Sequence, residues 1–315
     1  MKKSINFVQK HPLTIISTLL AICIVLWGIA AYIDSKSSDD IAETYYDRAS
    51  KSFNQKEYSA AQLFLDSIKI MSPGAFEWRH KANDFKLLIR KEEQTNTLKY
   101  IHQQLDTIAT QQKQVLKEQY KNVQDKKYQD LAQYVWYPQY LQTQQTTKSG
   151  YLFQVDEQGQ CYILTTYKGT TSEKIQSLTV TFKDGTNVTC QNEFGHQSNK
   201  IATGYTQTIS FHGDDAYSII EAMANENAQP SKMQITGNRS YTLPITHTDL
   251  SAAKKMAILS RLLVAKQGWL KQQKECVNEL RFLDKRINKQ EQKFEQQQEQ
   301  TQEQPQDSTS VSEPI

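Results

Sequence analysis

The chain has 315 residues, a formal net charge of +3 and a mean hydropathy of −0.67. Positive and negative residues are interspersed, which argues against a nucleic-acid-binding protein with a basic surface. Four cysteines are too few for a fold built on disulfides, and the scarcity of glycine (11) and proline (7) favours long helices.

The first predicted element is a single membrane-spanning helix. Residues 13–33 carry no charge, and about 20 apolar residues suffice to cross the hydrocarbon core of a bilayer. Lysines occur in residues 1–12, whereas the residues after the span are mainly acidic. Residues 1–12 are therefore predicted to be cytoplasmic, and residues 34–315 extracytoplasmic, on the periplasmic or cell-surface side. The alternative is a cleaved signal peptide, although its apolar region normally spans only about 7–15 residues.

Residues 34–74 are predicted to form a helical hairpin next to the membrane. The pattern lies in residues 42–73 and is carried by Tyr45, Ala49, Tyr58, Ala61 and Pro73. It resembles one unit of the tetratricopeptide family, which implies two antiparallel helices that approach closely at small residues. Because no second unit follows, we expect the hairpin to pack on the next helix, which begins near Phe76.

Two long helices are predicted, over residues 75–140 and 248–300, followed by a disordered tail at 301–315. Asp249 and Ser251 supply capping side chains near the start of the second helix. Both helices carry stripes spaced alternately by three and four residues, which is the pattern of a coiled-coil seam. The clearer stripe comprises Leu259, Leu262, Lys266, Trp269, Gln273, Cys276, Leu280, Leu283, Ile287, Gln290 and Phe294. We predict an antiparallel coiled coil within one chain; a parallel homodimer through the same stripes is the alternative.

Residues 150–247 lie between the two helices and predict a small all-β domain, either a sandwich or a partly open barrel. The expected strands are 151–156, 161–167, 178–182, 187–190, 205–211, 232–236 and 241–245. A short helix at 216–225 follows a capping Asp214 or Asp215. Cys161 and Cys190 both fall in this domain, where they form either a disulfide or two buried thiols.

Aromatic residues gather between the first long helix and the β domain, at Tyr134, Trp136, Tyr137 and Tyr140. Such rings bind sugars or partner chains in some proteins, but more often they wedge a domain against a helix. Pro138 is expected to help end the helix. His196, His212 and His247 lack the convergent spacing of metal ligands. The sequence therefore predicts no catalytic, cofactor-binding or metal site.

The predicted fold class is thus α+β: a transmembrane helix, a tetratricopeptide-like hairpin, and a coiled coil with an inserted β domain. This layout resembles that of bacterial envelope proteins. We expect a non-enzymatic, membrane-anchored protein that projects its β domain to bind or scaffold another envelope protein or a cell-wall component, without a cofactor. One alternative is a carbohydrate- or peptide-binding module that uses the aromatic residues at the junction of coiled coil and β domain. A hydrolase or metal-dependent enzyme in the β domain is the third hypothesis.

Overall fold

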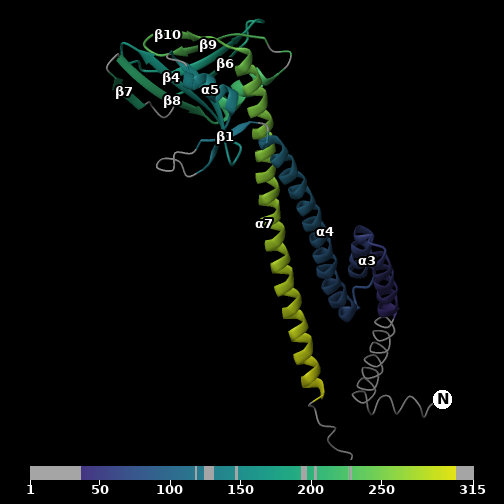
Figure 1. The fold of residues 1–315 in the computed structure, drawn as a ribbon. Helices are drawn as coiled ribbons and strands as arrows, with labels where there is room; N and C mark the ends of the chain where they lie inside the picture. The colour runs from purple at the N-terminus through teal and green to yellow at the C-terminus, as the bar shows by residue number, and fades with distance from the viewer. Residues whose placement is uncertain are drawn as a thin grey trace, which may run out of the picture. The chain divides into compact units, whose positions relative to one another are not determined.

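A computed structural model gives the architecture of most of the chain. It describes residues 37–117, 119–123, 131–145, 148–192, 197–201, 204–225, 227 and 229–302. The described residues form an α+β structure with six helices and two antiparallel sheets (Figure 1). The predicted span at 13–33 and the tail beyond residue 302 lie outside them. None of the described helices combines the length and the apolar character that a membrane crossing requires.

The chain divides into two compact units, and two long helices contribute to both. One unit comprises Met1–Lys99 and Glu275–Ile315, and the other comprises Tyr100–Lys274. Helix α4 (Phe76–Leu116) and helix α7 (His247–Gln302) each have one part in either unit.

The first unit is built from helices that pack around small residues. A helix at 37–54 is followed by a turn and by α3 (Tyr58–Met71), after which α4 begins. Ala49 and Ala61 are fully buried in one cluster with Phe85 and Ile89 of α4. The predicted helices, the turn between them and their packing on α4 are confirmed. The resemblance to the tetratricopeptide family stays a prediction.

In the first unit, the end of α7 runs antiparallel to the beginning of α4. The Cys276 thiol donates to the backbone oxygen of Gln94 at 3.2 Å. Lys91 Nζ lies 2.7 Å from Asp284 Oδ1. The contact farther along α7 therefore involves the residue nearer the start of α4, as expected for an antiparallel pair.

The same antiparallel contact recurs within the second unit. Tyr100 meets Trp269 edge to face, with ring centroids 5.8 Å apart. Lys266 Nζ donates to Gln112 Oε1 at 3.0 Å. Every position of the predicted α7 stripe through residue 290 is buried or half-buried, and the side chain at residue 294 lies outside the described part. The stripe is therefore covered by residues of the same chain.

The second unit contains two antiparallel sheets around one core. The first sheet has the strand order β1-β2-β3-β4-β8-β7, and the second has the order β10-β9-β5-β6. The strands are β1 (Tyr120–Asn122), β2 (Gln133–Trp136), β3 (Gly150–Asp156), β4 (Cys161–Gly169), β5 (Ser177–Phe182), β6 (Asn187–Gln191), β7 (Gln197–Ile201), β8 (Gly204–His212), β9 (Pro230–Thr236) and β10 (Ser240–Leu243). Helix α6 (Asp214–Ala224) and the first turns of α7 share the core with Phe153, Phe211 and Met233. All predicted strands are present, with small shifts at their ends.

The predicted extent of the first long helix is wrong. Helix α4 ends at Leu116 rather than near residue 140, and β1, β2 and α5 (Tyr137–Gln145) follow. Gln119 adopts φ 63°, which turns the chain so that β1 pairs with β2 and β2 pairs with β3. Pairing at the sheet edge thus overrides helix propensity, and the β-rich unit begins well before residue 150. Pro138 lies in the first turn of α5, where a missing N–H costs little, so it begins a helix instead of ending one.

Candidate functional site

Two of the four predicted aromatic residues have a structural role. Tyr134 and Trp136 are half-buried on β2 and pack against the core of the second unit. Tyr120 pairs with Trp136 across the two strands, and its hydroxyl donates to the backbone oxygen of Lys255 on α7 at 3.0 Å. Burial, helped by the nearby charge of Glu157, raises the pKa of Tyr134. Both rings thus pack on the core of the second unit and present no open platform.

The other two aromatic residues lie on α5, where Tyr137 is exposed and Tyr140 is half-buried. Tyr137 and Tyr140 stack with centroids 6.4 Å apart and an interplanar angle of 18°. Lys121 Nζ lies 4.0 Å from the centroid of the Tyr140 ring. Tyr137 is 41% exposed. The four aromatic residues therefore split into a pair on β2 and a stacked pair on α5.

Helix α5 is held in place by a buried polar network. Gln139, which is fully buried, accepts a hydrogen bond from the Phe153 N–H at 3.2 Å and donates to Asp249 Oδ1 at 2.9 Å. Asp249 Oδ2 accepts from both the N–H and the hydroxyl of Thr246, and the Thr246 hydroxyl accepts from the Asp249 N–H. This reciprocal arrangement is a capping box at the start of α7. The predicted capping role of Asp249 is confirmed.

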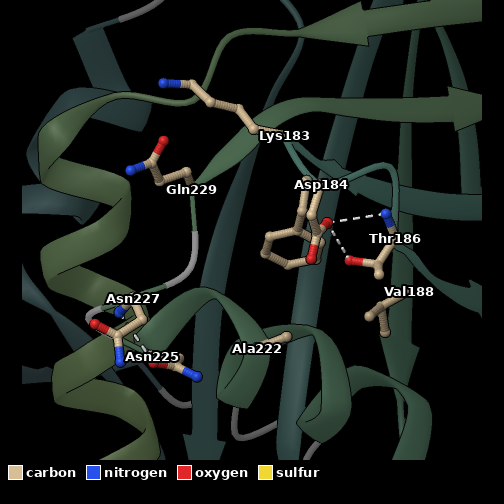
Figure 2. A pocket seen from close by; sticks show the side chains of 9 residues that line it. Lys183, Asp184, Thr186, Val188, Ala222, Asn225, Asn227 and Gln229 are labelled. Atoms are coloured by element: carbon tan, nitrogen blue, oxygen red, sulfur yellow. Dashed lines mark hydrogen bonds between the residues drawn. The ribbon is translucent and has the colours of Figure 1, made fainter.

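A cavity lies elsewhere in the described part of the chain, beside the turn between β5 and β6. It encloses about 630 Å³ in the second unit. Its lining residues come from the β5–β6 hairpin, from the end of α6 and from the segment before β9 (Figure 2): Phe182, Lys183, Asp184, Thr186, Val188, Ala222, Asn225, Asn227 and Gln229. A smaller cavity of about 210 Å³ lies between α5, β3 and β4. We call the larger cavity the hairpin cleft.

Local hydrogen bonds fix the walls of the hairpin cleft. Asp184 Oδ1 accepts hydrogen bonds from the Thr186 N–H at 2.9 Å and from its hydroxyl at 2.7 Å, and these bonds lower the pKa of Asp184 (Figure 2). The backbone N–H of Lys183 donates to the carbonyl oxygen of Gln229 at 2.9 Å, which joins the two walls. Asn225 Oδ1 accepts from the Asn227 N–H at 3.0 Å, so this wall is also ordered.

The cleft offers both hydrogen-bond donors and acceptors to a ligand. The side chains of Lys183, Asn227 and Gln229 are exposed. None of the three side chains forms a hydrogen bond with another residue that the structure describes. Helix α6 ends at Ala224 on the same side, and the last carbonyl groups of a helix lack partners within the helix. The side chain of Val188 adds an apolar patch. The matching ligand is therefore polar, with donors, acceptors and some C–H surface.

The remaining candidate residues of the sequence do not converge. No group of three or more histidine, cysteine or acidic side chains is placed for metal binding in the part of the chain that the structure describes. His212 packs its ring against Tyr162, with centroids 5.8 Å apart, and His196 lies outside the described residues. Cys161 on β4 and Cys190 on β6 lie in different sheets, and both are buried free thiols. The alternative of two buried thiols therefore holds, and the disulfide does not form.

The sequence predicted elements that border the hairpin cleft but not that they meet. The strands at 178–182 and 187–190 and the helix that ends at 225 were all expected from the sequence. Comparison of the chain with protein-family models, with curated proteins and with solved structures gave no match.

Proposed function

We propose that the chain is a non-enzymatic, membrane-anchored envelope protein whose β-rich unit binds another envelope component in the hairpin cleft. The anchor is the apolar segment 13–33, which places residues 34–315 outside the cytoplasm. The finer architecture belongs to the same proposal: a tetratricopeptide-like hairpin next to the membrane, and a coiled coil of α4 and α7 that carries the β-rich unit.

The observation that carries this proposal is the composition of the cleft. Its described lining has amide, ammonium, hydroxyl and carboxylate groups but neither histidine nor cysteine. The one carboxylate, on Asp184, is already engaged by Thr186, and those hydrogen bonds favour its ionised form. A group held in this way is suited to orienting a ligand, whereas general acid–base catalysis requires a group that exchanges protons near neutral pH.

The ligand class that fits best is a cell-wall glycan. Sugar hydroxyl groups both donate and accept hydrogen bonds, which matches the amides of Asn227 and Gln229. The C–H faces of sugar rings suit the apolar patch at Val188. Lys183 and Asp184 carry opposite charges, so the cleft has no strong preference for an anion or a cation. A glycan or glycan-linked component of the cell wall satisfies all three features.

The direct test is co-sedimentation of the full chain, solubilised in detergent, with insoluble cell-wall sacculi. We expect the unmodified chain to sediment with the sacculi. The double variant Asn227→Ala/Gln229→Ala should bind about tenfold more weakly, because each lost hydrogen bond contributes roughly 0.5–1.5 kcal/mol. The matched control is Gln176→Ala/Gln191→Ala, which removes two exposed amides at the other end of the β5–β6 hairpin. Equal binding by both double variants would contradict the assignment of the cleft.

A second candidate site is the stacked pair on α5, Tyr137 and Tyr140. Their near-parallel stacking and the exposure of Tyr137 favour contact with a sugar ring or a peptide. The same sedimentation assay distinguishes the two sites. If Tyr137→Ala/Tyr140→Ala loses binding while Asn227→Ala/Gln229→Ala retains it, the aromatic pair is the binding surface and the hairpin cleft is not.

A further inference from the structure

Three large apolar side chains stand exposed around one turn of the helical unit. Ile70 is 76% exposed, Met71 is 56% exposed and Phe76 is 70% exposed. The first two end α3 and the third begins α4. The opposite side of α3 is already used, because Leu65 and Ile68 are buried in the helical core. The core therefore does not account for the apolar character of this turn.

The turn lies beside the point where the chain enters the first described helix. A Cβ atom added at Gly74 would be 3.5 Å from the hydroxyl oxygen of Ser38, so the turn touches the first turn of the helix at 37–54. Ser38 comes only five positions after Ile33, the last residue of the predicted span. Five residues reach at most about 18 Å when fully extended. The turn is thus tethered close to the outer edge of the predicted membrane segment.

The flanking side chains suit a membrane interface. The Arg79 guanidinium lies 5.7 Å from the centroid of the Phe76 ring and donates to the backbone oxygen of Pro73 at 3.3 Å. Arginine side chains place an apolar stem along hydrocarbon while the charged end stays among polar groups. Aromatic and aliphatic side chains next to basic residues are typical of segments that lie in the headgroup region.

We propose that the α3–α4 turn inserts Ile70, Met71 and Phe76 into the outer face of the lipid bilayer that holds the anchor. The inference rests on the membrane anchor of the proposed function. It adds a second membrane contact, which fixes the helical unit against the bilayer surface. Acidic Asp39 and Asp40 lie in the first turn of the neighbouring helix, so the local charge is mixed. Insertion is therefore driven by apolar contact and should be insensitive to added salt.

The test measures the depth of labelled residues in the full chain, reconstituted into phosphatidylcholine vesicles. Single cysteines at Ile70→Cys and Phe76→Cys carry an environment-sensitive nitrobenzoxadiazole dye, in a Cys23→Ala background. Cys161, Cys190 and Cys276 are buried, and the labelled parent chain supplies the blank. The vesicles contain phosphatidylcholine with a nitroxide near the carbonyl end of the acyl chain. We expect strong quenching of the dye at both positions, unchanged by added salt.

Two matched controls come from exposed leucines of the same unit. Leu63 is 66% exposed and lies two helical turns before Ile70, about 10 Å along α3. Leu88 is 45% exposed and lies about 18 Å along α4 from Phe76. Labels at Leu63→Cys and Leu88→Cys should remain unquenched. Equal quenching at all four positions, or none at Ile70 and Phe76, overturns the proposal. Protection of those two positions from both the lipid nitroxide and aqueous iodide would indicate a second copy as the occupant and would also overturn it.

A further label separates this inference from the anchor on which it rests. Leu26→Cys lies within the predicted span. Quenching at Leu26 without quenching at Ile70 and Phe76 retains the anchor and rejects the membrane contact of the turn. No quenching at Leu26 rejects the anchor, and the membrane contact is then rejected with it.

Discussion

Helix α7 is stabilised differently in the two units to which it contributes. In the β-rich unit, its first turns bury Ala252, Ala253 and Met256 completely in a broad core. In the helical unit, the described side chains of α7 bury only a narrow stripe that includes Cys276 and Leu283. The same helix thus begins as part of a globular core and continues as one member of a helix pair.

The polar contacts differ in the same way. Asp249 is 4% exposed and receives hydrogen bonds from Gln139 and from Thr246. Lys91 and Asp284 form an ion pair in which the two side chains are 45% and 49% exposed. When a buried hydrogen-bond partner is removed, the groups that it bonded stay buried without a partner. When an exposed partner is removed, water takes its place. Polar substitutions should therefore be costly at the start of α7 and nearly neutral near its end.

The largest effect is expected from Asp249→Ala. The substitution removes the capping box of α7 and leaves the buried amide of Gln139 without its acceptor. The free energy of unfolding should fall by about 3 kcal/mol, the sum of a lost cap and an unsatisfied buried donor. Urea unfolding of the detergent-solubilised chain measures it. Asp214→Ala is the control, since Asp214 also lies in a first helical turn but α6 has no side-chain cap. Similar losses for both variants would contradict a special role of the buried network.

The next largest effect concerns the packing of the β3–β4 turn on α7. Gly159 has φ +89°, and an added Cβ would lie 2.7 Å from Val264 Cγ2 and 2.8 Å from the Ser260 carbonyl oxygen. Gly185 has φ +87°, but nothing lies within 4 Å of the added atom. Both alanine variants carry the backbone strain of roughly 1–2 kcal/mol. Gly159→Ala should therefore lower the melting temperature clearly more than Gly185→Ala. Equal shifts would show that the turn yields without disturbing α7.

The elements that the sequence predicted well are those with a one-sided pattern. The alternation of Leu178, Val180 and Phe182 with threonines predicted β5 because one face of that strand is buried in the core. The stripe on α7 predicted its buried face through residue 290 for the same reason. In each case, the spacing of apolar residues along a short segment indicates which side of the element is buried.

The elements that the sequence did not predict depend on contacts with residues farther away in the chain. Strand β1 is a three-residue strand that exists through pairing with β2, and Gln119 turns the chain without the glycine that would signal a turn. Strand β7, Gln197–Ile201, is largely polar and lies at a sheet edge, so it shows no apolar alternation. The hairpin cleft escaped prediction because its turns meet only after the strands pair. Exposed Asn227 and Gln229 look like any solvated loop residues.

A smaller effect, dependent on pH, is expected from the buried thiol of Cys161. Burial raises its pKa from the ordinary 9.0 to about 11. The folded state then retains the proton when the unfolded state loses it, so this contribution to stability is full below pH 9 and is lost as the pH rises toward 11. At pH 10, it should have fallen by about 1.4 kcal/mol. Urea unfolding at pH 7 and pH 10 measures the loss. Cys161→Ala should show a smaller loss over this interval, and an identical loss in both proteins would contradict the assignment.

The smallest effect is expected at the ion pair of Lys91 and Asp284. The nitrogen and oxygen are 2.7 Å apart, but both side chains are about half exposed to water. Exposed pairs of this kind contribute roughly 0.2–1 kcal/mol. Lys91→Ala, Asp284→Ala and the double variant form a cycle that isolates the interaction between the two charges. We expect a coupling below about 0.5 kcal/mol in physiological salt, and less in high salt because the charges are screened. A coupling comparable with the loss in Asp249→Ala would mean that charge, and not the narrow apolar stripe, holds this part of α7 to α4.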